Sequence, residues 1–248
     1  MFLALLAVGW AVLEGGYRLG RWRHLRSADE KDAPVGAMVA AVLGLVAFML
    51  AFTFGLAAQR FDLKRQVVLD EANAIGTTYL RTRMLPAPQK MEIAHLLREY
   101  VDLRVDAAAR GGLGDAGEKS EKLQEAIWQQ AVAVSDKDRT PIAALFVDSL
   151  NQMIDLHSTR SQTELRSRIP LVIWIVLYSL SALGVAAMGY QAGLSATRRS
   201  PAMMALVIAF TGVLFLIVDL DRSNAGFLMV DQTAMTDLQR SMHATETP

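Results

Sequence analysis

The sequence contains no cysteine, no strand-like alternation and no excess charge of either sign. The lack of cysteine excludes disulfides, thiolate catalysis and cysteine-ligated metal or iron–sulfur sites. Acidic and basic residues balance at 25 each, so nothing indicates a nucleic-acid partner and we expect none. No stretch alternates apolar and polar residues with the period of a strand. These absences predict an all-α protein.

What the chain has in abundance is apolar sequence, at 52% of its residues. Three runs without charge, residues 35–58, 169–197 and 200–218, each reach the roughly 18 to 20 residues that cross a bilayer as a helix. A fourth run opens the chain at residues 1–17 and is interrupted by Glu14. It lacks the basic start and small-residue cleavage site of a signal peptide, so we expect a retained first helix. The sequence predicts an integral membrane protein with four transmembrane helices in contact with lipid.

The polar residues between the second and third spans are patterned as further helices. Arg60 to Met84 has no proline and one glycine, so it should extend the second span until Pro86 and Pro88 end it. Other helices are expected at residues 89–109, at 118–134, and from Pro141, after Thr140 as N-cap, into the third span at Pro170. The predicted organisation is two transmembrane helices (1–58), a helical extramembrane domain (59–168), two more transmembrane helices (169–219) and a C-terminal tail (220–248).

Membrane orientation is not assigned by the charges. With four spans, the N-terminus, the helical domain and the tail share one side. The two short loops on the other side carry seven basic residues, and seven stand close to the membrane on the domain side. The positive-inside rule therefore ties.

Motifs for catalysis or metal binding have little support. Residues 112–117, GLGDAG, match a dinucleotide-binding pattern but lie between two amphipathic helices without the required strand, which favours a loop. The four histidines are scattered, and His157 is interpreted as a structural histidine. Asp219 and Asp221 close the last span and either fix its end or act in function. We expect no enzyme, no cofactor and no metal site.

The second span carries the most informative pattern. Small residues recur at three- and four-residue steps and form one stripe: Gly36, Ala40, Gly44, Ala47, Ala51, Gly55 and Ala58. Such a stripe permits close helix approach. Beside it, Phe48 and Phe52 are one turn apart. Aromatic rings repeated around a symmetry axis would form an apolar constriction that gates by dewetting.

The same predicted helix then becomes polar without a break. Its apolar side should pack on the other domain helices: Phe61, Val68, Ala72, Ile75 and Tyr79. Its polar side suits either an ordinary solvated helix or the wall of an ion pathway: Asp62, Gln66, Asp70, Asn73, Thr77 and Arg81.

These residues carry a family resemblance that covers nearly the whole chain. The segments AFMLAFTFGLAAQRFDLKRQVVLDEANAIGTTYLRTRMLP (47–86), REYVDLR (98–104) and DLDRSNAG (219–226) are similar to the bestrophin-like domain family of prokaryotic membrane proteins. The name reflects a distant similarity to bestrophins, which are pentameric ion channels. The resemblance implies a multi-pass protein of the bacterial inner (plasma) membrane. It also implies a pore lined by the second helix, with Phe48 and Phe52 at neck positions.

Departures from the bestrophin pattern limit what the resemblance implies. FDLKRQ replaces the tryptophan-rich segment of bestrophins, and their acidic calcium-binding cluster has no counterpart, so calcium gating is not implied. The leading hypothesis is a homo-oligomeric, pentameric ion channel, with inorganic ions and further copies of itself as partners. The constriction would be Phe48 and Phe52, and the vestibule would be the polar side from Asp62 to Arg81. The alternative is a non-conducting scaffold or sensor whose helical domain binds a partner or ligand.

Overall fold

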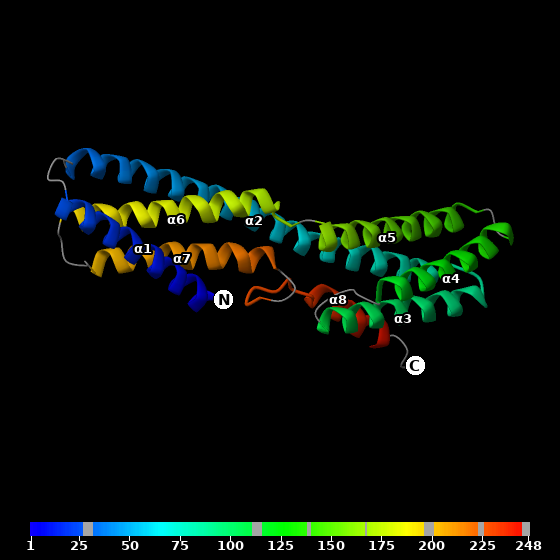
Figure 1. Cartoon of the computed structure of the whole chain (residues 1–248). Coiled ribbons are helices and arrows are strands. Elements are labelled where there is room, and N and C mark those ends of the chain that lie inside the picture. The colour runs from blue at the N-terminus through cyan, green and yellow to red at the C-terminus, as the bar shows by residue number, and fades with distance from the viewer. Residues whose placement is uncertain are drawn as a thin grey trace. The chain divides into compact units, whose positions relative to one another are not determined.

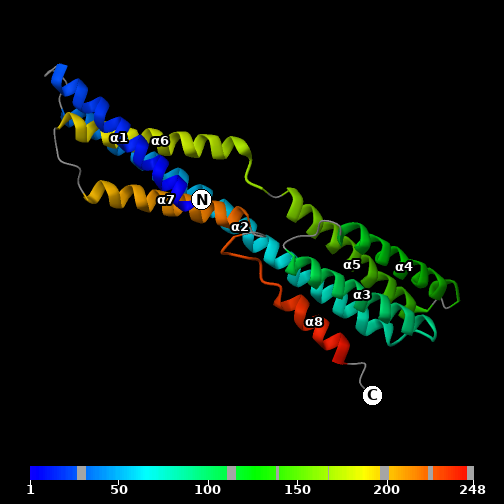
Figure 2. The same ribbon diagram turned by 60° about the horizontal axis from the view of Figure 1, so that its bottom comes forward.

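The computed structural model describes residues 1–26, 32–110, 116–137, 140–166, 168–195, 201–222 and 226–244. Within these ranges all regular structure is helical, which confirms the predicted all-α class (Figures 1 and 2). The helices are α1 (Phe2–Arg26), α2 (Asp32–Thr82), α3 (Gln89–Ala109), α4 (Ala116–Lys137), α5 (Pro141–Arg166), α6 (Leu171–Leu194), α7 (Pro201–Asp221) and α8 (Thr233–Ala244).

The chain divides into two units. Met1–Gln59 with Arg168–Arg222 form the membrane unit, and Arg60–Ser167 with Ser223–Pro248 form the extramembrane unit. Among the described residues, four helices are long and apolar enough to cross a membrane, namely α1, α2, α6 and α7. The four predicted spans are confirmed, and the protein is a multi-pass membrane protein.

Helices α1 and α6 of the membrane unit approach so closely that only glycine fits between them. A Cβ on Gly16 would lie 2.2 Å from the carbonyl oxygen of Ala186, and one on Gly20 would lie 2.1 Å from that of Tyr190. From the other side, a Cβ on Gly189 would lie 2.3 Å from the oxygen of Leu13. Glycine therefore permits backbone contact between two transmembrane helices here.

The small-residue stripe of α2 does not take part in such an approach. Among the described residues, nothing lies within 4 Å of a Cβ placed on Gly44 or Gly55, while a Cβ on Gly36 would meet only the Gln191 side chain. Ala40, Ala47 and Ala51 are exposed. Close packing within one chain therefore does not explain the stripe. The backbone contacts lie instead between α1 and α6.

The extramembrane unit is a bundle in which α3, α4 and α5 lie alongside the second half of α2 (Figures 1 and 2). Its core comes from every helix of the unit and includes Ile75, Leu97, Ile127, Phe146 and Met235. The predicted apolar side of α2 contributes Val68, Ala72, Ile75 and Tyr79, all buried. Phe61 is only half-buried.

Most helix ends fall where the sequence predicts. Helix α2 continues past the membrane to Thr82, and α3 spans residues 89–109. The Thr140 hydroxyl accepts the backbone N–H of Ala143 at 3.4 Å, as expected for the N-cap of α5.

Two helix boundaries differ from the expectation. Helix α5 ends at Arg166 and does not run into the third span, because the residue before Pro170 is disfavoured in helical conformation. The tail contains α8, which packs on α3 and buries Met235 and Met242 in the core. The Tyr79 hydroxyl donates to the carbonyl oxygen of Met242 at 3.3 Å, which fixes the end of α8.

Candidate functional site

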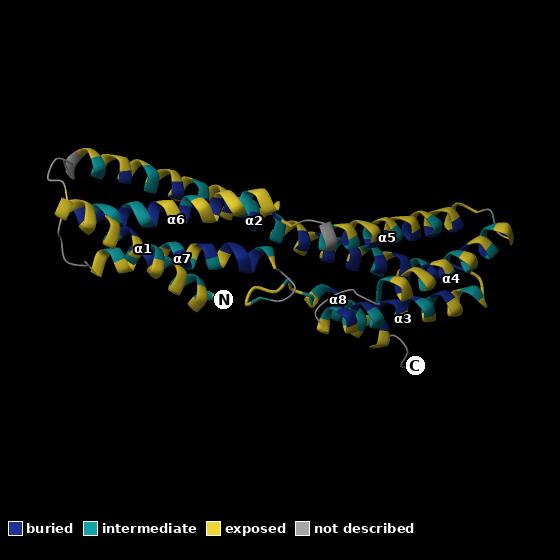
Figure 3. Ribbon diagram, viewed as in Figure 1, coloured by how far each residue is buried: buried dark blue, intermediate teal, exposed yellow. Residues whose placement is uncertain are grey.

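Within its own chain, α2 leaves the predicted constriction residues uncovered. Phe48 is 63% exposed and Phe52 is 53% exposed, beside the small-residue stripe. The first half of α2 carries mainly exposed and half-buried positions (Figure 3). Phe54, two residues further, points to another side because successive helical residues are rotated by about 100°. Two large aromatic side chains on a bare helix face are available to lipid, to another copy of the chain or to a pore.

The predicted vestibule residues also lie on an uncovered face of α2. Asp62, Gln66, Asn73 and Thr77 are exposed, while Asp70 and Arg81 are half-buried. At 3.6 residues per turn, these six residues and the two phenylalanines fall within a sector of about 100° around the helix. One side of a single helix of 51 residues is therefore aromatic first and polar afterwards.

Three of these polar residues have partners within the unit. Gln66 donates to the Asp70 carboxylate at 2.8 Å, one turn along α2. Arg81 donates to the carbonyl oxygen of Leu145 on α5 and lies 3.9 Å from the Asp148 carboxylate. Arg81 therefore fixes α5 against α2, a role that sequence spacing did not indicate.

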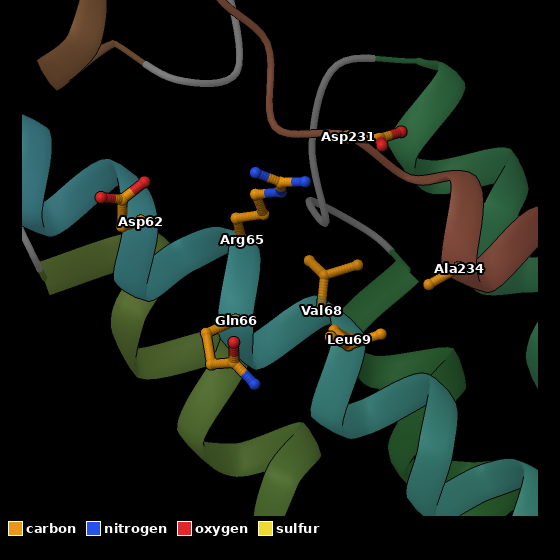
Figure 4. Close-up of a pocket in the computed structure, with 7 residues that line it drawn as sticks. All are labelled: Asp62, Arg65, Gln66, Val68, Leu69, Asp231 and Ala234. Atoms are coloured by element: carbon orange, nitrogen blue, oxygen red, sulfur yellow. The ribbon is translucent and has the colours of Figure 1, made fainter.

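A pocket of about 370 Å³ lies next to the first extramembrane turns of α2 (Figure 4). Asp62, Arg65 and Gln66 line it from α2, and Asp231 lines it from the segment before α8. The Arg65 side chain extends from α2 toward the segment that carries Asp231 (Figure 4). The Thr233 hydroxyl and backbone N–H bind Asp231 and lower the pKa of its carboxyl group. The pocket thus joins two predicted vestibule residues to a fixed carboxylate.

A buried ionic cluster lies inside the extramembrane unit. Glu71 of α2 is fully buried and binds two buried arginines, Arg104 of α3 and Arg160 of α5. Arg104 Nη2 lies 3.1 Å from the Glu71 carboxylate, and Arg160 Nη1 lies 2.6 Å from Glu71 Oε2. Arg160 Nε also donates to Glu164 at 2.8 Å. One carboxylate thus holds three helices together.

Neutral polar groups complete this cluster. The Tyr100 hydroxyl lies 3.1 Å from Glu71 Oε1 and 2.9 Å from His157 Nδ1, and it accepts the Gln124 amide at 3.3 Å. If the tyrosine donates its single proton to Glu71, His157 must donate from Nδ1. Gln124 brings α4 into the same network. The hydrogen-bond network around the buried carboxylate therefore includes groups from every long helix of the unit.

The surroundings set the charges of these groups. Burial alone would raise the pKa of Glu71, but the Arg104 and Arg160 guanidiniums lower it below the usual value, so the carboxylate is ionised. Burial, and then the charge of Glu71, raises the pKa of Tyr100. Burial, and then Arg104, lowers the pKa of His157. Tyr100 and His157 are therefore neutral at pH 7 and serve structure, as expected for His157.

Sequence reasoning missed this cluster although a signal was present. Glu71 lies three residues after Val68 and four before Ile75, on the apolar side of α2. Arg104 continues the apolar side of α3 in the same way, after Leu97 and Tyr100. A charge in register with buried residues must find an opposite charge, because an isolated buried ion is too costly. Two such charges on adjacent helices would have predicted the pair.

The remaining candidates have structural roles or lie partly outside the described residues. Glu14 accepts a hydrogen bond from Arg18 at 2.8 Å, and Asp221 accepts the backbone N–H of Ile169 at 2.9 Å. Asp221 thus connects the end of α7 to the residues before α6. Of the GLGDAG motif, residues 112–115 lie outside the described part of the chain. Among the described residues, no group of three or more His, Asp or Glu side chains could hold a metal ion.

Solved structures with a similar fold and a protein-family model both match this chain. Two solved structures of a bacterial bestrophin homologue from Klebsiella pneumoniae match at TM-scores of 0.75 and 0.71, each with 13% sequence identity. The matches cover 100% and 98% of this chain, and 99% and 98% of the homologue. A third structure, described as a membrane protein, matches at a TM-score of 0.76 with 13% identity, over 100% of this chain and 99% of that one. No curated protein matches the sequence. The model of the Bestrophin-like domain matches residues 5–235, and the chain therefore belongs to the Bestrophin-like domain family.

Proposed function

We propose that the protein is a homo-oligomeric ion channel in which α2 from each of five copies lines a central pore. Phe48 and Phe52 form the constriction, and the side of α2 from Asp62 to Arg81 forms the vestibule. The number of copies follows the resemblance to bestrophins. The family membership and the likeness in fold support the proposal.

One observation carries the proposal furthest. The aromatic and polar residues share one side of α2, and this side is left largely uncovered by the rest of the chain. A polar helix side facing solvent is ordinary, but two phenylalanines and a small-residue stripe at membrane depth need a neighbour or lipid. Helices arranged around an axis satisfy both conditions, because small residues allow close approach and aromatic rings can close the pore by dewetting.

Recording from the purified protein in planar lipid bilayers tests this assignment. We expect current from the wild type and an increase of several-fold in conductance or open probability for the double variant Phe48→Ala/Phe52→Ala, because the apolar barrier is removed. Phe54→Ala is the matched control, since Phe54 is a membrane-depth phenylalanine on another side of α2, and it should conduct like the wild type. Absence of current, or an unchanged double variant, contradicts the assignment.

A second function, a non-conducting sensor, is favoured by the pocket at Asp62, Arg65 and Asp231, which could receive a ligand. This function predicts a monomer or dimer, whereas a pore requires several copies of α2. Light scattering of the protein in detergent separates the two. A protein mass that corresponds to five chains supports the channel. A mass that corresponds to one or two chains supports the sensor.

A further inference from the structure

A basic groove of about 870 Å³ lies where α2 ends and α3 begins, and the functions discussed above do not use it. Tyr79 and Thr82 of α2, with Arg83 just beyond its end, form one wall, and the first turns of α3 form the other. All of its lining residues belong to the extramembrane unit. Its volume falls in the range of pockets that hold small molecules, about 300 to 1,000 Å³.

The charges of this groove are strongly unequal. Arg83, Lys90 and Arg98 line it, and Glu92 is the single carboxylate among the lining residues that the structure describes. The pocket of Figure 4 has the opposite balance, with two aspartates and one arginine. The extramembrane unit thus carries a pocket and a groove whose lining residues have opposite net charge. The groove, which is the larger of the two, is suited to an anion.

The basic groups are held at different depths. Arg98 is half-buried and donates from Nη1 to the Tyr79 hydroxyl at 3.2 Å, and Tyr79 is itself fixed by its bond to Met242. Arg83 and Lys90 are exposed. The floor therefore presents one positioned guanidinium, and the rim presents two exposed cations.

We propose that this groove binds a small polyanion that carries at least two phosphate or carboxylate groups. Guanidinium and ammonium groups form their strongest hydrogen bonds with these anions, and arginine does so with two parallel bonds. A single anionic group would occupy only one of the three cations. Tyr79 and Met91 also line the groove, and their apolar surface can contact an organic part of the ligand between its anionic groups. The binding does not depend on the proposed channel activity.

Isothermal titration of the full-length protein in detergent, at low salt, tests the proposal with two probes. Tripolyphosphate represents the phosphate class and citrate represents the carboxylate class. We expect saturable binding of at least one probe, and the preferred probe identifies the class. Hydrogen bonds to charged groups are worth about 1.5 to 3 kcal/mol, so Lys90→Gln and Arg98→Gln should each weaken binding by roughly tenfold or more.

Arg110→Gln supplies the matched control. Arg110 is an exposed arginine that follows the last residue of α3 and pairs with Asp106 at 3.1 Å, outside the groove. It should bind like the wild type. Absence of saturable binding overturns the proposal, and so does an equal loss in the Arg110 variant, which would show attraction by overall charge. Arg98 also contacts Tyr79, so Arg98→Gln could fail to fold. In that case the result for Lys90→Gln, at an exposed position, confirms or overturns the proposal.

Discussion

The two units of this protein solve the problem of joining helices in different ways. The membrane unit brings α1 and α6 into backbone contact at glycines, where a single methyl group would collide with a carbonyl oxygen. The extramembrane unit joins its helices through Glu71, buried between Arg104 and Arg160. In lipid, burial of apolar surface gives no advantage over contact with lipid tails, so close packing must hold helices together. In water, an apolar core already does so, and here a buried ionic cluster also links α2, α3 and α5.

Loss of the central carboxylate should have the largest effect. Glu71→Gln preserves shape but leaves Arg104 and Arg160 buried without their counter-charge, and we expect the extramembrane unit to lose about 3 to 5 kcal/mol of unfolding free energy. Urea titration can follow Trp128, the single tryptophan of that unit, after the other three are replaced by phenylalanine.

The control for Glu71→Gln is another carboxylate that pairs with a cation at the surface. Glu118 of α4 binds Lys122 at 2.7 Å, and its side chain is 75% exposed. Glu118→Gln should change the unfolding free energy by less than about 0.5 kcal/mol, because exposed pairs contribute little. Equal effects of the two substitutions would show that the buried cluster does not organise the unit.

The glycine contacts of the membrane unit should produce the next largest effect. Gly16→Ala places a Cβ 2.2 Å from the Ala186 carbonyl oxygen, so α1 and α6 must separate. We expect a loss of about 1 to 3 kcal/mol, the usual cost of overpacking. The measurement is the temperature at which half of the size-exclusion peak in detergent is lost on heating, and this midpoint temperature should fall.

The neighbouring glycine is an internal control for this substitution. A Cβ on Gly15 meets nothing within 4 Å. Gly15→Ala should leave the midpoint unchanged or raise it slightly, since alanine is favoured over glycine in a helix by up to about 1 kcal/mol. If both variants lose the same stability, close approach of α1 and α6 is not what holds the membrane unit together.

The smallest effect concerns the pH dependence of the extramembrane unit. Burial lowers the pKa of His157 from its usual 6.5, so the unfolded chain binds a proton as the pH falls below that value and the folded chain does not. The stabilisation is complete above pH 6.5 and is lost as the pH falls toward the folded pKa. We expect a loss of about 1 kcal/mol between pH 7 and pH 5.5.

Substitution of His157 should remove this dependence. Urea titration of His157→Gln, followed by Trp128 fluorescence, should give a flatter stability profile over that range. His95→Gln should retain the wild-type profile, because His95 is exposed on α3. A profile that stays steep in His157→Gln would assign the proton uptake to another group. The membrane unit, which has no such cluster among its described residues, should show no matching change.

The sequence predicted the helices well because helix formation here depends on local signals. Long apolar runs predicted the four spans. The absence of proline predicted the long α2, and Pro86 and Pro88 predicted its end. The apolar side of α2 was predicted for the same reason, since residues three and four apart share a face. Helix α8 was missed because its short amphipathic pattern becomes visible only with a partner surface on α3.

The candidate site was predicted only in part. The residues that share one side of α2 follow from their spacing, whereas their exposure depends on what the other helices cover. The roles of Phe48, Phe52 and the polar residues in conduction remain predictions.

By itself, the sequence determined the long helices, which of them cross the membrane and which side of α2 is apolar. These properties follow from the hydropathy and spacing of neighbouring residues. Only the tertiary structure decided that α1 and α6, rather than the stripe on α2, make the glycine contacts, and that Glu71, Arg104 and Arg160 meet. Such contacts join residues far apart in the chain, and their energy depends on the distance and burial of both partners, which spacing along one helix does not specify.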